Sequence, residues 1–198
     1  MDRPADNLEG RPQGAAGVAE VARIISRAGL VEAFGHVSAR SGDGFLITPT
    51  RPLGKTSESD VLELDAHGQP VREADDVPLE APLHAAVYAA REDVGAVVRT
   101  HSPAAVAAGA DGEVPPLVHG LGGLAGEVAI CDRIDLVADA EAGRQVAGSG
   151  DHGLPGAQRS LPGHDLLAFG EDGGPSGMVN RAVDSAAAHQ GGVGGVDD

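Results

Sequence analysis

The sequence predicts an α/β or α+β fold built on a mixed β-sheet, and three observations support this. Segments with helical and with strand periodicity alternate along the chain. Segments 35–40 and 45–48 are predicted strands joined by the sequence SGDG, a turn that favours an antiparallel hairpin. Segment 94–99 is short, apolar and rich in valine, which is typical of a buried strand.

The length of 198 residues favours one domain, which we expect to span residues 14–190. Residues 1–13 are expected to form a disordered arm and residues 191–198 a flexible tail, because both are polar or rich in glycine. No apolar run of about 18 residues and no apolar leader segment is present, so a cytoplasmic protein without a membrane span is expected.

The charge and the rare residue types exclude several classes of function. A net charge of −16 argues against binding to nucleic acids or anionic membranes, which need basic patches. Lys55 is the only lysine and lies in a polar segment, so a Schiff-base aldolase has one weak candidate. Cys131 is the only cysteine, which excludes an internal disulfide and a zinc thiolate site.

The other elements follow from periodicity and turn residues. Apolar residues at helical spacing predict a helix over 15–27 that ends at Gly29. Further helices are predicted at 80–90, 103–110, 136–147 and 176–189, a helical turn at 57–60, and strands at 62–64, 128–131, 158–161 and 166–169.

Segment 78–106 holds the main candidate functional residues. Glu80 stands at the start of a helix in which Pro82 suits the first turn. Arg99 and His101 lie two residues apart at the end of the following strand, and therefore on the same side of it. We therefore expect Glu80, Arg99 and His101 to lie near one another, at the end of this strand and the start of the helix.

Four groups of motifs in this order resemble the class II aldolase/adducin family, over residues 15–190. They read GHVS at 35–38 with FLITPT at 45–50, EAPLHAAVY at 80–88, DVGAVVRTHSP at 93–103, and PGHD at 162–165 with LAFG at 167–170. The resemblance implies a class II aldolase-like α/β/α fold with a central, mostly antiparallel sheet and helices on both faces. It also implies a homotetramer.

In the family, three histidines hold a divalent ion, usually zinc, and a glutamate acts as acid and base. The resemblance places Glu80, His101 and His164 at three of these positions, but Arg99 stands where the first histidine is expected. Arginine is a permanent cation with no acceptor atom, so it cannot bind a metal.

Three interpretations follow for this site. His101, His164 and Glu80 could hold zinc or iron, with His84 or His36 as additional ligand. Alternatively, the metal is absent and Arg99 supplies its charge, binding a carboxylate or an ene-diolate oxygen. In the third interpretation the site is inactive.

Each candidate also has a structural explanation. Arg99 could equally be a surface arginine paired with Glu92 or Asp93. The helix dipole alone favours an acid at Glu80. His84, one helical turn later, suits either a contact with Glu80 or simple packing.

The expected phosphate site is also altered. His36 replaces an asparagine of the family, Arg51 replaces a glycine, and the dipeptide at 78–79 replaces two serines, whereas Ser38 and Thr50 are kept. An anion other than a sugar phosphate, such as a carboxylate, is therefore expected. The candidate substrate-binding residues are His36, Ser38, Thr50, Arg51 and His119, the last of which suits a loop position equally well.

These observations predict a lyase with Glu80 and Arg99 as catalytic residues. The expected substrate is a small anionic hydroxy-carbonyl compound in a specialised pathway, and the reaction is a retro-aldol cleavage, a decarboxylation or a dehydration through an enolate. The alternatives are an iron oxygenase with two histidines and one carboxylate as ligands, and a non-catalytic member of the family. The substrate and the bond that is broken do not follow from the sequence.

Overall fold

A computed structural model describes residues 14–32, 34–110, 128–131, 137–149, 163–170 and 175–182. Seven strands form one sheet in the order β3-β2-β1-β4-β6-β7-β5. The strands are β1 (His36–Ser41), β2 (Gly44–Ile47), β3 (Leu62–Leu64), β4 (Val94–Thr100), β5 (Val128–Cys131), β6 (Gly163–Gly170) and β7 (Pro175–Ala182). Every pairing is antiparallel except that of β5 with β7. The predicted mixed, mostly antiparallel sheet is therefore confirmed.

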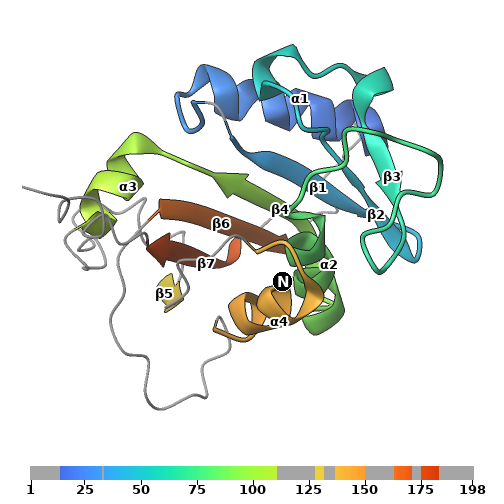
Figure 1. The fold of residues 1–198 in the computed structure, drawn as a ribbon. Helices are drawn as coiled ribbons and strands as arrows, with labels where there is room; N and C mark the ends of the chain where they lie inside the picture. Colours follow the sequence, from blue (N-terminus) through green and yellow to red (C-terminus); the bar gives the residue numbers. More distant parts are fainter. Residues whose placement is uncertain are drawn as a thin grey trace, which may run out of the picture.

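The helices lie on both faces of this sheet (Figure 1). They are α1 (Gly14–Arg27), α2 (Ala81–Ala90), α3 (Pro103–Ala110) and α4 (Ala140–Ser149), with short 3-10 helices η1 (Leu53–Lys55) and η2 (Glu58–Asp60). Figure 1 shows α1 on one side of the sheet and α2 and α4 on the other. Both faces of an amphipathic sheet are thus covered, as an α/β/α arrangement requires.

Helix α1 closes the core on its side of the sheet. Its apolar stripe packs on β1, β4 and η1, in a cluster made of Val18, Ala22, Ile25, Val37, Leu53 and Val98. The helix ends where predicted, because Gly29 adopts a left-handed conformation with φ of 69°. The amide of Gly29 donates to Ser26 O and that of Leu30 to Ile25 O, which is the Schellman pattern.

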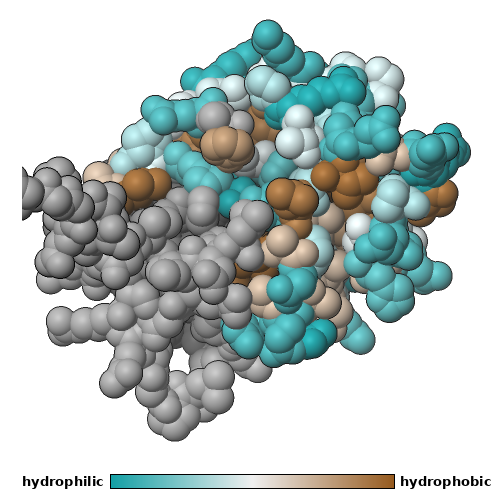
Figure 2. Space-filling view, in the orientation of Figure 1, coloured by the Kyte–Doolittle hydropathy of each residue, from teal (hydrophilic) through white to brown (hydrophobic). Residues whose placement is uncertain are grey.

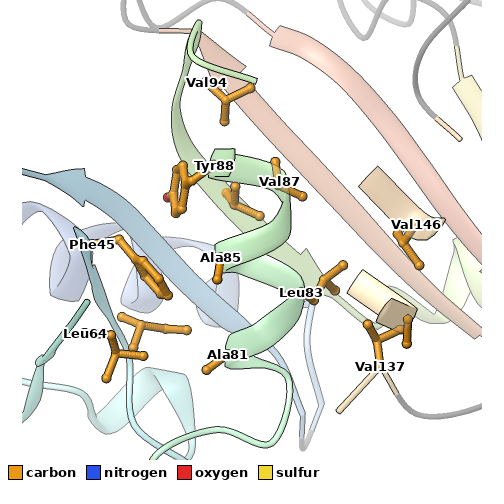
Figure 3. Close-up of a cluster of buried hydrophobic side chains, with 13 residues drawn as sticks. Phe45, Leu64, Ala81, Leu83, Ala85, Val87, Tyr88, Val94, Val137 and Val146 are labelled. Carbon is orange, nitrogen blue, oxygen red and sulfur yellow. The ribbon is translucent and has the colours of Figure 1, made fainter. Parts of the chain in front are cut away.

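The larger core lies on the opposite face, between α2, α4 and the sheet. It contains Phe45, Ile47, Leu64, Leu83, Val87, Tyr88, Val94, Val97, Val137 and Val146, together with small alanines. Figure 3 shows Leu83 and Val87 directed toward Val137 and Val146, and Tyr88 toward Phe45. The core is made of valine, leucine, isoleucine and alanine with two aromatic rings.

The chain also departs from the predicted elements. Residues 176–182, the first part of the helix that the sequence predicts at 176–189, belong to strand β7 instead, because β6 and β5 pair with this strand on both sides. Such pairing overrides a helical pattern in a short segment. The helix predicted at 136–147 begins at Ala140, because the Asp139 carboxylate accepts the amide of Ala142 and fixes the start there. The predicted strand 158–161 lies outside the described residues.

The surface in Figure 2 is mostly hydrophilic over the described residues, with small separated hydrophobic areas. The exposed large apolar side chains are Val21, Ile24, Leu30, Phe34, Val71 and Leu79. No helix in the described part of the chain is long and apolar enough to span a membrane. The arm 1–13 and the tail 191–198 lie outside the described residues, so their disorder stays a prediction.

Replacing Gly143 by alanine is expected to lower the free energy of unfolding by about 1–3 kcal/mol. Alanine normally stabilises a helix relative to glycine, but a Cβ atom at Gly143 would lie 2.7 Å from Pro82 O and 2.9 Å from Ala86 Cβ. Helices α2 and α4 would have to separate. Urea unfolding measures the change, with the exposed Arg144→Ala in the same helix as the control. An increase in the free energy of unfolding in Gly143→Ala would contradict the close contact between α2 and α4 at this residue.

Candidate functional site

The site lies where β4 ends against β1 and the start of α2. Arg99 on β4 is the register partner of His36 on β1. Glu80 is the residue immediately before α2, and its side chain makes no capping hydrogen bond with that helix. Instead, Glu80 Oε1 lies 3.1 Å from Nη2 of Arg99, and Glu80 Oε2 lies 3.5 Å from Nε2 of His36. Three segments distant in sequence therefore meet at one carboxylate.

A glycine allows this close meeting of strands. A Cβ atom at Gly35 would lie 2.9 Å from Arg99 O and 2.7 Å from Val31 Cγ1. The chain that leads into β1 thus passes directly against the backbone of Arg99. The glycine of the GHVS motif is needed for close approach here.

Arg99 is a buried residue and does not form a surface ion pair. Its side chain is 3% exposed and that of Glu80 is 12% exposed. Of the two surface partners considered for Arg99, Glu92 and Asp93, the second is bound by Arg91 instead. The interpretation of Arg99 as a surface arginine is therefore wrong.

The environment of Glu80 keeps it ionised. Burial by itself raises the pKa of the Glu80 carboxyl, but the contact with His36 and the positive charge of Arg99 outweigh it and lower the pKa to about 2. At neutral pH the carboxylate is a weak base in the ligand-free protein. Any proton transfer by Glu80 would require that its contact with Arg99 change.

His101 is held as a neutral imidazole. Its Nδ1 lies 2.8 Å from the carbonyl oxygen of Phe34, so this nitrogen carries the proton that it donates. Burial and the positive charge of Arg99 lower the pKa of His101 to about 4, against the raising effect of the Phe34 contact. The lone pair therefore lies on Nε2, which is the arrangement seen in histidines that bind ligands.

Ser38 and His84 form a buried chain beneath this cluster. Ser38 Oγ lies 2.7 Å from His84 Nδ1 and 2.7 Å from the hydroxyl of Tyr88. His84 is completely buried, and burial, with the charges of His36 and Arg99, lowers its pKa well below the usual value. Ser38, predicted to bind substrate, makes both contacts inside the protein.

The sequence analysis missed Tyr88, although a signal for it existed. Glu80, His84 and Tyr88 are spaced by four residues and so lie on one face of the helical segment. The ring of His84 also lies 6.4 Å from that of His36. His36 Nδ1 and His84 Nε2 are buried without a hydrogen-bond partner among the described residues.

The predicted anion-binding residues Thr50 and Arg51 lie on the surface. The guanidinium of Arg51 contacts Asp60 at 3.0 Å and Asp76 at 2.7 Å, and its side chain is 55% exposed. Two carboxylates thus offset its single positive charge. The amide of Thr50 donates to Asp76 O, so both residues hold a surface loop.

Two predicted site histidines are described less fully. His119 lies outside the described residues. His164 is described by its backbone, as the register partner of Arg181 on β7. Thr100, the last residue of β4, pairs with Asp165 on β6, so His101 directly follows β4 next to the pair, and His164 is the adjacent residue of β6. Their proximity along the strands agrees with a shared site, and their joint role stays a prediction.

The described donors do not fit the expected metal site. Among the described residues, no group of three or more His, Cys, Asp or Glu side chains is arranged to hold a metal ion. His101 has the donor geometry of a ligand, but Arg99 places a fixed positive charge two residues away. Glu80, the expected carboxylate ligand, contacts Arg99 with one oxygen and His36 with the other.

Comparison with known proteins identifies the family. The profile described as "Class II Aldolase and Adducin N-terminal domain" matches residues 16–172. Because this match covers most of the chain, the protein belongs to the class II aldolase/adducin family. The resemblance seen in the sequence is thus confirmed.

Individual relatives agree in family and differ in reaction. A 3,4-dihydroxyphthalate decarboxylase of Arthrobacter keyseri is 33% identical over 46% of this chain and 41% of its own length. A 5-methylthioribulose-1-phosphate/5-deoxyribulose-1-phosphate aldolase of Rhodospirillum rubrum is 33% identical over 56% of this chain and 50% of its own. The chain spans about half the length of these relatives.

The fold also agrees with solved structures. An L-fuculose-1-phosphate aldolase from Thermus thermophilus superposes with a TM-score of 0.56 and 26% identity, over 67% of each chain. An aldolase II superfamily protein from Pseudomonas syringae gives a TM-score of 0.62 at 22% identity, over 83% of this chain and 68% of its own. The predicted class II aldolase-like fold is therefore confirmed.

Proposed function

We propose that this protein is a lyase that cleaves a carbon–carbon bond in a small hydroxy-carbonyl compound bearing a carboxylate. The buried Arg99–Glu80 pair, flanked by His36 and His101, carries this proposal. It combines a fixed cation, which suits a carboxylate or an enolate, with a carboxylate that can move a proton. The family and its aldolase and decarboxylase relatives support a lyase-type reaction.

The residues at the expected phosphate site favour a carboxylate over a phosphate. Leu79, which stands in place of a serine, has no hydroxyl and is 67% exposed. Arg51 is already paired with two acids, and Ser38 is bound to His84 and Tyr88. One relative is named for 3,4-dihydroxyphthalate, a ring with two carboxylates and two hydroxyls. A related hydroxylated carboxylate is the proposed class of substrate here.

Arg99 would act first, by binding the substrate anion, and Glu80 would then transfer a proton. A substrate anion that contacts Arg99 competes with Glu80 for the guanidinium. Without that contact, one of the causes that lower the pKa of Glu80 is removed while the raising effect of burial remains, so the pKa rises and Glu80 becomes a better base, although His36 still opposes this rise. In a retro-aldol cleavage, Glu80 takes the proton of the β-hydroxyl, that oxygen becomes a new carbonyl, and the bond between the α- and β-carbons breaks with its electron pair passing to the first carbonyl oxygen as an enolate. In a decarboxylation, the electron pair comes instead from the bond between the α-carbon and the carboxylate, which leaves as CO2. Arg99 stabilises this charge, and a proton returned to carbon completes the product.

The assembly and location belong to the same proposal. Active class II aldolases act on small molecules as oligomers, so a homotetramer in the cytoplasm remains the expectation. The acidic charge continues to disfavour nucleic-acid and membrane partners.

Turnover of a defined panel of compounds tests the proposal. We would incubate the protein with 3,4-dihydroxyphthalate, other hydroxylated carboxylates, L-fuculose 1-phosphate and 5-methylthioribulose 1-phosphate, and follow products by proton NMR. Cleavage of a carboxylate and not of the phosphates is expected. Glu80→Gln is expected to reduce kcat about 100-fold or more, because the amide cannot move the proton.

The matched control is Glu92→Gln, which changes an exposed acid just after α2 and should leave turnover unchanged. Cleavage of the sugar phosphates alone would contradict the proposed substrate class. Equal turnover by wild type and Glu80→Gln would contradict the role of Glu80.

A further inference from the structure

We propose that Arg99 excludes a divalent ion from this site and itself supplies the positive charge that binds the ligand, so that the protein works without a metal. The exclusion of metal rests on the geometry of Arg99, Glu80 and His101. The ligand class, a carboxylate, rests on the proposed function.

The position of Arg99 is the first step of the argument. Arg99 is the last residue but one of β4, and His101 follows the strand directly, so both residues lie at the same strand end, two residues apart. Arg99 is also the register partner of His36. A cation that bound to His101 Nε2 would therefore approach a guanidinium that is itself 3% exposed and little screened by solvent.

The engagement of Glu80 is the second step. A carboxylate that binds a metal directs an oxygen at the ion, but Oε1 of Glu80 faces Arg99 at 3.1 Å and Oε2 faces His36 at 3.5 Å. Recruiting Glu80 to a metal would break its contact with the buried Arg99 guanidinium. Removing one member of a buried pair is unfavourable, so the pair opposes such a rearrangement.

The charge balance is the third step. Among the described side chains of the cluster, the charges of Arg99 and Glu80 cancel one another without a bound ion. A guanidinium presents paired N–H groups in a plane, which match the two oxygens of a carboxylate. An anionic ligand can therefore exchange with Glu80 at Arg99, whereas a divalent cation would add uncompensated charge.

Metal binding can be measured without any substrate. Tag-free protein would be dialysed against zinc and, without oxygen, against ferrous iron, and metal content determined by plasma mass spectrometry. Wild type is expected to retain no stoichiometric metal. Arg99→His is expected to gain about one zinc per chain, because it adds a neutral nitrogen ligand two residues from His101. Arg99→Gln removes the charge but adds no such ligand and should stay metal-free.

About one metal per wild-type chain, lost in His101→Ala, would overturn the inference and leave the lyase proposal standing. A folded Arg99→His variant that gains no zinc would overturn the role given to Arg99. Circular dichroism checks that each variant is folded. If Arg99→His is not folded, zinc titration of wild type by calorimetry decides: saturable binding contradicts the inference, and no binding supports it.

Discussion

Replacing Arg99 by methionine is expected to lower the free energy of unfolding by about 3–5 kcal/mol at neutral pH. The change leaves Glu80, which is 12% exposed, without its cationic partner. The methionine fills much of the same volume, so most of the loss comes from charge. Urea unfolding followed by circular dichroism measures it.

Two variants separate this effect from a general loss of packing. Arg91→Met breaks the pair with Asp93, in which both side chains are more than a third exposed, and should cost no more than about 1 kcal/mol. Adding Glu80→Gln to Arg99→Met removes the stranded charge and should restore part of the stability. A loss for Arg99→Met no larger than for Arg91→Met would contradict the buried pair.

The stability of the protein is expected to fall in two stages as the pH is lowered. The first stage involves His84 and His101, whose folded pKa values are depressed below 6.5. Their contribution is complete above pH 6.5, because the unfolded chain binds more protons below it. Each histidine then loses its contribution progressively as the pH falls toward its folded pKa, which is about 4 for His101.

The second stage involves Glu80. Its folded pKa of about 2 lies below the ordinary value of 4.5, so its contribution is present above pH 4.5 and is lost between pH 4.5 and 2. The full shift corresponds to at most about 3 kcal/mol. The folded pKa values of Asp60, Asp65, Asp93 and Glu141 are also lowered, so Glu80→Gln should reduce the second stage without abolishing it, and should keep the first. Unfolding free energies measured from pH 7 to 3 test both, and an unchanged acid profile in Glu80→Gln would contradict this assignment.

Most of the fold followed from local signals in the sequence. The hairpin turn at 41–44, the glycine after α1 and the valine-rich β4 each specify their element through chemistry within a few residues. Strand β7 could not be predicted in this way, because its conformation depends on pairing with β5 and β6, which are distant in sequence. The late start of α4 depended on one side-chain cap at Asp139.

The sequence predicts which residues form the site, but it does not predict which of them contact one another. The sequence placed Glu80, Arg99 and His101 together through the strand end and the helix start. It could not decide whether Arg99 was buried, because that depends on β1 and its His36 packing beside it. It also assigned Ser38 to a ligand, whereas the structure pairs Ser38 with His84 and Tyr88 inside the core.

An NMR titration of the Glu80 side-chain carboxyl carbon tests the central claim most directly, because it reports whether Arg99 and Glu80 form a pair in the folded protein. Assignment would come from comparison of wild type with Glu80→Gln. A pKa of about 2 in wild type, which shifts upward in Arg99→Gln while the contact with His36 remains, is the predicted result. A wild-type pKa at or above 4.5, unchanged in Arg99→Gln, would contradict the account.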